Sequence, residues 1–123
     1  MNWLILSKNR AAQLDLLLRS MKLHGWPMES VTVVYTWTTP EFAAGYEKLI
    51  SAWPSLRWKK QDHFRNDVME AWLDTVETHT ALLVDDDVCL APLDMADVVV
   101  SDAALEPRYK RMLEANAMQV LLA

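Results

Sequence analysis

Short, β-prone apolar runs alternate with amphipathic helical patterns along most of this chain. This alternation predicts an α/β fold, because helices that connect consecutive strands make those strands parallel, and such crossovers are right-handed. We expect a Rossmann-like, mainly parallel sheet in the order 3-2-1-4, flanked by helices. The expected strands are Trp3–Ser7, Val31–Thr36, Leu56–Lys60 and Thr80–Val84, and the expected helices are Arg10–Leu23, Thr38–Trp53 and Asn66–Glu77.

Each expected helix has an apolar stripe at helical spacing, which indicates that one face packs on the sheet. Asn9 is expected to be the N-cap of the first helix, and Thr38 with Glu41 has the spacing of a capping box at the second. The residues expected to face inward are Leu14, Leu17, Leu18 and Met21 in the first helix, Phe42, Tyr46, Leu49, Ile50 and Trp53 in the second, and Val68, Met69, Trp72, Leu73 and Val76 in the third.

The alternation ends after Pro92. Val98–Val100 fits either a short strand or a helical turn, and Pro107–Leu122 is expected to be a helix with an apolar stripe. We therefore expect one α/β domain over residues 1–100. Residues 101–123 should form a C-terminal helical tail that belongs to the same compact unit or makes a dimer contact.

Three consecutive carboxylates, Asp85, Asp86 and Asp87, follow the last expected strand. Open α/β sheets bind ligands at the carboxyl ends of their strands. Adjacent carboxylates repel one another, and hard divalent cations prefer such oxygen ligands. In an extended chain, Asp85 and Asp87 point to the same side, so this pair is the candidate metal site. The alternative is a solvated acidic turn.

The turn after the first strand, Ser7–Arg10, should open on the same crevice. Its backbone N–H groups and the Arg10 side chain are suited to an anion or to the edge of a nucleobase. The alternative is an ordinary turn between a strand and a helix, with a capping Asn9 and a surface arginine.

Charge and composition exclude some classes of protein. The chain has 123 residues, the length of one domain, and a net charge of −5 with scattered basic residues, which argues against a nucleic-acid binder. It has one cysteine, no recognisable signal peptide and no apolar run long enough for a transmembrane segment. We therefore expect a cytoplasmic protein.

Several ordered motifs resemble those of GT-A-type nucleotide-sugar glycosyltransferases over residues 1 to 95. They are Leu4–Arg10 followed by Gln13–Ser20, the segment from Phe42 through Gly45, Tyr46 and Leu49, Phe64–Asp67 before the last strand, and Val84–Val88 with its acids. The resemblance implies a GT-A-like half-domain that binds a nucleotide-sugar donor with the help of Mn²⁺ or Mg²⁺, which neutralises the leaving diphosphate.

The resemblance also implies roles for individual residues. Asp87 would bind the metal, and Asp85 would meet the ribose or sugar and share the metal, with Asp86 between them in the donor-binding set. By the same resemblance, the nucleoside would be held by Ser7, Asn9, Arg10, Tyr35 and Thr36, and the base would be approached by Gln61 and Asp67.

Glycosyltransferases of this type are longer and carry the acceptor site in their second half. The expected function is therefore a metal-dependent glycosyltransferase or its donor-binding half, with a sugar or glycan acceptor and with a homodimer as the expected assembly. One alternative is a non-catalytic nucleotide- or metal-binding module. Another is a haloacid-dehalogenase-like phosphatase, in which Asp85 would attack phosphorus and Asp87 would act as acid–base; that family places its motif on the first strand.

Overall fold

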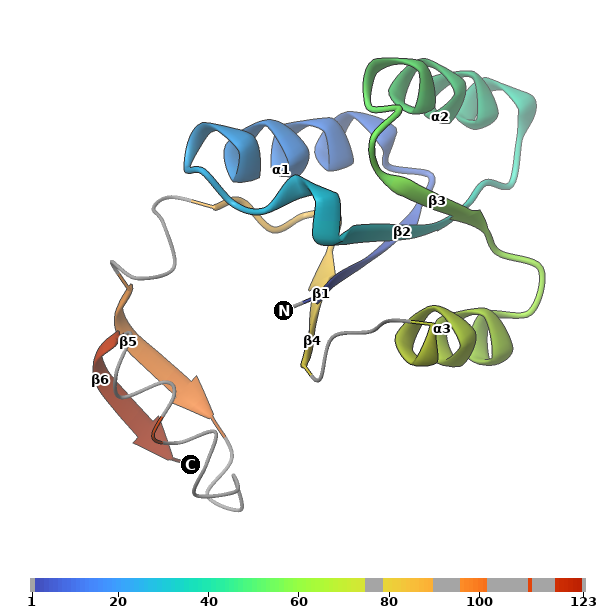
Figure 1. Cartoon of the computed structure of the whole chain (residues 1–123). Coiled ribbons are helices and arrows are strands. Elements are labelled where there is room, and N and C mark those ends of the chain that lie inside the picture. Colours follow the sequence, from blue (N-terminus) through green and yellow to red (C-terminus); the bar gives the residue numbers. More distant parts are fainter. Residues whose placement is uncertain (1, 75–78, 90–95, 102–110, 112–116, 123) are drawn as a thin grey trace.

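A four-stranded parallel sheet forms the centre of the structure (Figure 1). The computed structural model describes residues 2–74, 79–89, 96–101, 111 and 117–122. The strands are β1 (Asn2–Lys8), β2 (Val31–Thr36), β3 (Arg57–Lys60) and β4 (Thr80–Val84). Their order is β3-β2-β1-β4 and every neighbouring pair is parallel, which confirms the predicted fold class, strand order and chain direction.

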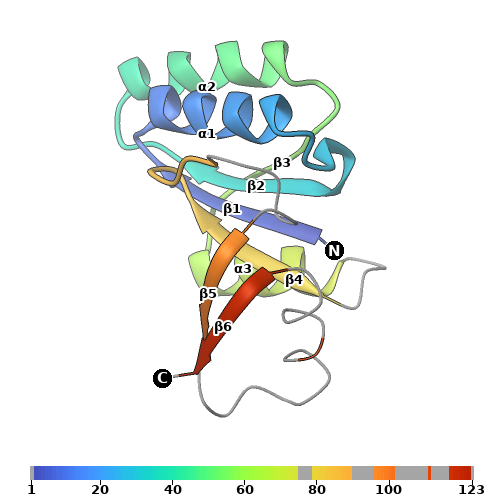
Figure 2. The ribbon, with the colours of Figure 1, turned by 90° about the vertical axis from the view of Figure 1, so that its left-hand side faces the viewer.

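Helices cover both faces of this sheet (Figure 2). The helices α1 (Ala11–Leu23) and α2 (Pro40–Ala52) lie side by side on one face, and α3 (Phe64–Leu73) lies on the other. A single 3₁₀ turn, η1 (Met28–Ser30), leads into β2. These three helices match the prediction in type, and their ends differ by a few residues.

The main core lies between the sheet and the pair α1–α2. The predicted stripe of α1 is completely buried, and in α2 Tyr46 and Leu49 are buried as predicted, whereas Phe42 is exposed. These helices pack on residues that alternate along the strands, including Trp3 and Ile5 of β1. Alternation follows from the period of two in a strand, which sends successive side chains to opposite faces.

The two helices approach each other closely at Gly45 of α2. A Cβ atom placed on Gly45 would lie 2.8 Å from the Cβ atom of Ala11 in α1. Real Cβ atoms do not come so close, so the absence of a side chain at Gly45 sets the spacing between α1 and α2.

The predicted inward face of α3 was wrong in part. Val68 and Ala71 pack on the sheet, but Met69, Trp72 and Leu73 are exposed; Val76 lies outside the described residues. The helix lies against β2, so it covers only part of this face of the sheet. Residues of β4 on the same side, such as Leu82, are consequently exposed as well.

Both predicted helix caps were wrong. Asn9 adopts a left-handed conformation with φ of 58°, and its side chain forms two 2.9 Å hydrogen bonds with Thr38 instead of capping α1. The N-cap residues are Arg10 for α1 and Thr39 for α2, and neither makes a side-chain capping hydrogen bond. The Asn9–Thr38 pair therefore ties the turn after β1 to the turn after β2.

The end of the predicted C-terminal helix is a strand. β5 (Ala96–Ser101) and β6 (Ala117–Leu122) form a separate parallel pair, so the strand alternative for Val98–Val100 is the correct one. Most of the remaining part of the predicted Pro107–Leu122 helix lies outside the described residues. The run from Ala117 to Leu122 has apolar residues that suit a strand as well as a helix, and pairing with the β-branched Val98–Val100 run favours the strand.

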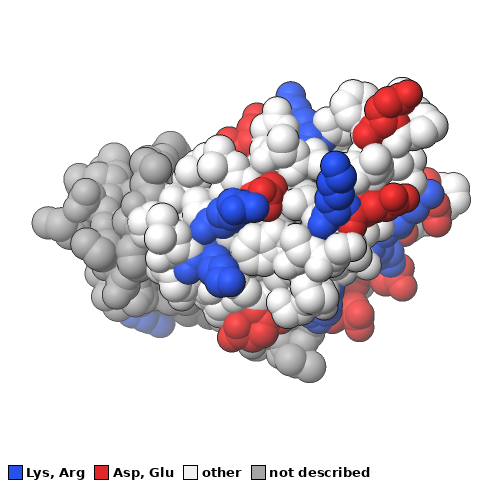
Figure 3. Space-filling model, turned by 90° about the horizontal axis from the view of Figure 1, so that it is seen from above, with Lys and Arg blue, Asp and Glu red and all other residues white. Residues whose placement is uncertain are grey.

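Acidic and basic side chains are mixed on the surface of α1 and α2 (Figure 3). This view from above shows Lys and Arg residues next to Asp and Glu residues, without a continuous basic face. In the part of the chain that the structure describes, no helix is long and apolar enough to cross a membrane.

Candidate functional site

The candidate site lies where β1 and β4 end side by side. The chain passes from β1 outward to β2 and β3, and then returns to place β4 on the other side of β1. The crevice at the carboxyl ends of β1 and β4 is therefore the point at which the strand order reverses. Open α/β sheets bind ligands at this point, because the loops on its two sides diverge and leave a gap. We call it the β1–β4 crevice.

Asp85, the first residue after β4, is held by the end of β1. One of its carboxylate oxygens, Oδ2, accepts a 2.8 Å hydrogen bond from the Ser7 hydroxyl and a 3.2 Å hydrogen bond from the Lys8 backbone N–H. The residue is 6% exposed. Burying a carboxylate is costly unless it is hydrogen-bonded or paired, so these donors make its position tolerable and fix its orientation.

Tyr46 extends this network to α2, and its part was not anticipated from the sequence. Its hydroxyl lies 2.7 Å from the Ser7 hydroxyl and accepts a 3.1 Å hydrogen bond from the Arg10 backbone N–H. Burial raises the pKa of Tyr46, although its hydrogen bonds with the Ser7 hydroxyl and the Arg10 backbone N–H work in the opposite direction. The phenol therefore stays neutral, and its hydrogen bond fixes the position of the Ser7 hydroxyl. Its place on a buried helical stripe was the available signal, because a buried tyrosine hydroxyl needs a partner.

Arg10 provides positive charge at the mouth of the crevice. Its Nη1 atom lies 3.1 Å from Oδ2 of Asp86 and 3.9 Å from Oδ1 of Asp85. The Arg10 and Asp86 side chains are both largely exposed, so the ion pair contributes little to stability. An exposed guanidinium at this position can exchange a carboxylate for another anion at small cost, because its N–H groups suit the oxygens of both carboxylate and phosphate.

A cavity of about 620 Å³ opens beside these groups. Its size is within the range of small-molecule sites, roughly 300–1,000 Å³. The walls combine the polar ends of the strands with apolar side chains: Leu6, Ser7, Lys8, Arg10, Val34, Gln61, Phe64, Val84 and Asp85. Four predicted site residues, Ser7, Arg10, Gln61 and Asp85, are thus brought together, whereas Lys8 and Phe64 were not predicted.

The remaining predicted donor-binding residues have other contacts. Tyr35 is buried among the aromatic rings of Trp37, Tyr46 and Trp58, and the backbone oxygen of Thr36 accepts a hydrogen bond from Asn9. None of Asn9, Tyr35 and Thr36 lines the cavity. They instead shape the turns from which the lining residues project.

Asp67 likewise has a local partner. It accepts 2.7 Å hydrogen bonds from the backbone N–H groups of Asp62 and His63, and these bonds lower its pKa. Asp67 thus closes the loop that precedes α3, and it does not line the cavity. The same loop is positioned at its start by Gln61, whose backbone N–H donates to the Tyr35 carbonyl oxygen at 2.8 Å.

The acidic turn, Asp85–Asp87, has limited free capacity for a cation. Oδ2 of Asp87 accepts a 2.9 Å hydrogen bond from the Val84 backbone N–H, just as Oδ2 of Asp85 is bound to Ser7 and Lys8. Among the described residues, no group of three or more His, Cys, Asp or Glu side chains is arranged to hold a metal ion. One oxygen each of Asp85 and Asp87 is therefore engaged by hydrogen bonds within the protein, and Oδ2 of Asp86 is paired with Arg10.

Comparisons with known proteins found no relative of this chain. No protein family, curated protein or solved structure matches the chain. Any functional conclusion therefore rests on the fold and on the geometry of the β1–β4 crevice.

Proposed function

We propose that the β1–β4 crevice binds a nucleotide-sugar donor, and that the chain is a metal-dependent glycosyltransferase or the donor-binding half of one. The observation that supports this most is the position of the Ser7–Asp85–Tyr46 network. It holds an acidic residue at the reversal of strand order, beside a cavity of about 620 Å³. A ligand with an anionic centre and a planar base suits this combination of charge and apolar wall.

The lining residues suggest how the donor would lie. Arg10 is a cationic side chain of the cavity, as is Lys8, and would meet the diphosphate. Phe64 also lines the cavity, is half exposed and offers an aromatic ring for a base, and the amide of Gln61, another lining residue, can donate and accept hydrogen bonds at the base edge. Oδ1 of Asp85, which lies 3.9 Å from Nη1 of Arg10, would bind a sugar hydroxyl or the cation.

A divalent cation would bind between the acidic turn and the diphosphate, with Asp87 and Asp85 as its protein ligands. Mn²⁺ or Mg²⁺ would neutralise charge on the leaving group when the sugar departs. Because the described acids leave few free oxygens, we expect the cation to bind well only when the nucleotide is present.

This proposal is tested by calorimetry with UDP-, GDP-, CMP- and dTDP-linked sugars, with and without Mn²⁺. At least one donor should bind, and Mn²⁺ should strengthen its binding. Asp87→Ala should abolish the Mn²⁺ effect, whereas Asp86→Ala should reduce it less, since Asp86 already pairs with Arg10. Equal Mn²⁺-dependent affinity in wild type and Asp87→Ala would contradict the assigned ligand.

Turnover separates the enzyme from the alternative of a non-catalytic nucleotide-binding module. Hydrolysis or transfer of the bound sugar supports the enzyme, and donor binding without either supports the module. The phosphatase alternative has less support, because Oδ2 of its would-be nucleophile Asp85 already accepts two hydrogen bonds. Release of phosphate from a phosphomonoester, lost in Asp85→Asn, would favour it.

The homodimer stays a prediction. Exposed apolar side chains of α3 and β4, such as Trp72 and Leu82, are compatible with a contact between copies. Sedimentation equilibrium that returns only the 14.1 kDa monomer mass at high concentration would contradict it.

A further inference from the structure

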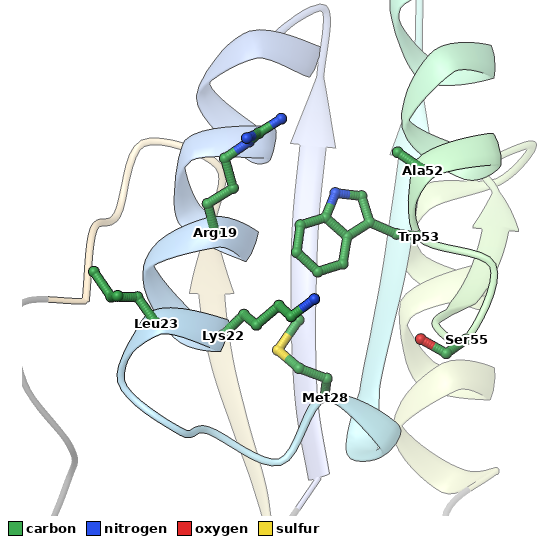
Figure 4. Close-up of a pocket in the computed structure, with 7 residues that line it drawn as sticks. All are labelled: Arg19, Lys22, Leu23, Met28, Ala52, Trp53 and Ser55. Carbon is green, nitrogen blue, oxygen red and sulfur yellow. The ribbon is translucent and has the colours of Figure 1, made fainter.

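A second cavity lies at the opposite pole of the α/β unit, between the C-terminal ends of α1 and α2 (Figure 4). Both helices begin next to the carboxyl ends of strands, so their last turns lie at the other end of the sheet from the acidic turn. The cavity has a volume of about 740 Å³ and is lined by Arg19, Lys22, Met28 and Trp53 among others. We call it the α1–α2 groove, and none of its residues belongs to the β1–β4 crevice.

Asp15 fixes two side chains of this groove in place. Its Oδ2 atom accepts a 2.7 Å hydrogen bond from Nε of Arg19, and its Oδ1 atom accepts a 3.2 Å hydrogen bond from the indole N–H of Trp53. One carboxylate therefore orients a guanidinium on α1 and an indole at the end of α2. This arrangement leaves the terminal nitrogens of Arg19 directed into the space between the helices (Figure 4).

Lys22 adds a second positive charge. Its ammonium lies 5.6 Å from the centroid of the Trp53 ring, and the side chain extends from α1 into the groove (Figure 4). Within the described residues no carboxylate forms an ion pair with Lys22. Cations near a helix C-terminus are favourable in themselves, but that preference does not require the side chain to lie over an indole.

Because Asp15 neutralises Arg19, Lys22 is what makes the groove positive in a chain whose net charge is −5, and the floor of the groove is apolar. Trp53 and Met28 provide a flat aromatic surface and an adaptable thioether, while Arg19 and Lys22 provide charge at the rim. We propose that the α1–α2 groove binds a small organic anion with a flat apolar ring, namely an aromatic carboxylate. The carboxylate would meet Lys22, the ring would pack on Trp53 and Met28, and Arg19 would add attraction from the other end of the indole (Figure 4).

The test uses 2-naphthoate as the probe and the full ¹⁵N-labelled chain, followed by NMR. The proposal expects saturable shifts of the Trp53 indole N–H, assigned by its loss in Trp53→Phe, and of the Lys22 amide. Lys22→Gln should weaken binding by about tenfold, as expected for loss of a charge-assisted contact, and Arg19→Gln should weaken it less, because Arg19 is already paired with Asp15. Lys48→Gln is the matched control, because Lys48 is an exposed lysine of α2 outside the groove.

The charge requirement is tested separately with 2-naphthol, which has the same ring and is neutral at pH 7. It should bind at least about tenfold more weakly than 2-naphthoate. Equal affinity for the two probes, unchanged affinity in Lys22→Gln and Arg19→Gln, or shifts centred on the exposed apolar residues of α3 would each overturn the proposal. Because Lys22 and Arg19 are exposed, their substitution should leave the spectrum outside the groove unchanged.

Discussion

At the scale of single residues, the crevice depends on one hydroxyl. The Ser7 hydroxyl lies between the Tyr46 phenol at 2.7 Å and the Asp85 carboxylate at 2.8 Å. It joins the end of β1 to a residue of α2 and to a residue that follows β4. Ser7 was predicted to contact the donor, but its hydroxyl is used inside the protein, where it positions Asp85.

Ser7→Ala should lower the free energy of unfolding by about 1–3 kcal/mol, since it leaves a buried carboxylate and a buried phenol each short of one hydrogen bond. Urea unfolding measures this loss. Ser51→Ala is the control, because the Ser51 hydroxyl is exposed and bonds only to the Glu47 carbonyl within α2. Its effect should stay within about 0.5 kcal/mol, and equal losses in the two variants would contradict the role of Ser7.

Burial of the Tyr46 phenol predicts a dependence of stability on alkaline pH. Its pKa is raised in the folded state, chiefly by desolvation, whereas the unfolded value is about 10. The contribution of the neutral phenol is therefore complete below about pH 10 and is lost as the pH rises through the folded pKa. Urea unfolding between about pH 8 and pH 11 should show a shallower decline in Tyr46→Phe than in wild type.

The pKa of Tyr35 is raised by burial as well, so some alkaline decline should remain in Tyr46→Phe. Identical declines in the two proteins would show that Tyr46 does not contribute. The experiment compares the slope of the free energy of unfolding against pH. An overall loss of stability in the variant does not change that slope.

The place of Asp85 in the fold could be predicted from the sequence, whereas its link through Ser7 to Tyr46 could not. Asp85 and Ser7 each follow or end an apolar strand, so their place at the sheet edge could be inferred from the strand pattern. The link to Tyr46 joins residues 39 apart in sequence, and it depends on how α2 packs against α1. Local patterns do not contain that information. Asp67 differs in the opposite way, since it accepts hydrogen bonds from its own neighbours Asp62 and His63, and its role toward a base stays a prediction.

At the scale of elements, the contact between α1 and α2 places the Tyr46 hydroxyl within hydrogen-bond distance of Ser7. Gly45 precedes Tyr46, and its missing side chain lets α2 approach Ala11 at the start of α1. The position of the phenol, and through it the geometry of the crevice, follows from this close approach.

Gly45→Ala should lower the free energy of unfolding by up to about 2 kcal/mol, because overpacking costs about 1–3 kcal/mol and the gain in helix propensity returns about 1 kcal/mol. Urea unfolding of the variant measures the change. Adding Ala11→Gly removes the opposing Cβ atom and should recover much of the loss. A gain in stability for Gly45→Ala alone, as at an exposed helical glycine, would show that the helices can separate freely.

Element types were predictable where one period dominated, as in the Leu14–Met21 stripe of α1. The inward face of α3 was harder to predict, because apolar residues lie on more than one side of that helix and only Val68 and Ala71 reach the sheet. The Ala117–Leu122 run is ambiguous between strand and helix, and its pairing with β5 decides for a strand.

At the scale of the whole molecule, the order β3-β2-β1-β4 creates the crevice. Right-handed crossovers between parallel strands leave few alternative topologies, which explains why the order could be predicted from the alternation of strands and helices. The reversal at β1 then gathers the ends of two strands that are far apart in the sequence. The α1–α2 groove lies at the other end of the same unit, so the two sites can be tested independently.

The most direct test of the central claim is to locate a bound donor by NMR. The ¹⁵N-labelled chain is titrated with the nucleotide-sugar that binds most tightly in calorimetry, in the presence of Mg²⁺, which does not broaden the signals. The account predicts the largest shifts at the backbone amides of Ser7, Lys8, Gln61 and Asp85, with binding weakened by Arg10→Gln and unchanged by Arg19→Gln. Absence of binding by every donor, or shifts concentrated at Arg19 and Lys22 with the β1–β4 crevice unperturbed, would contradict it.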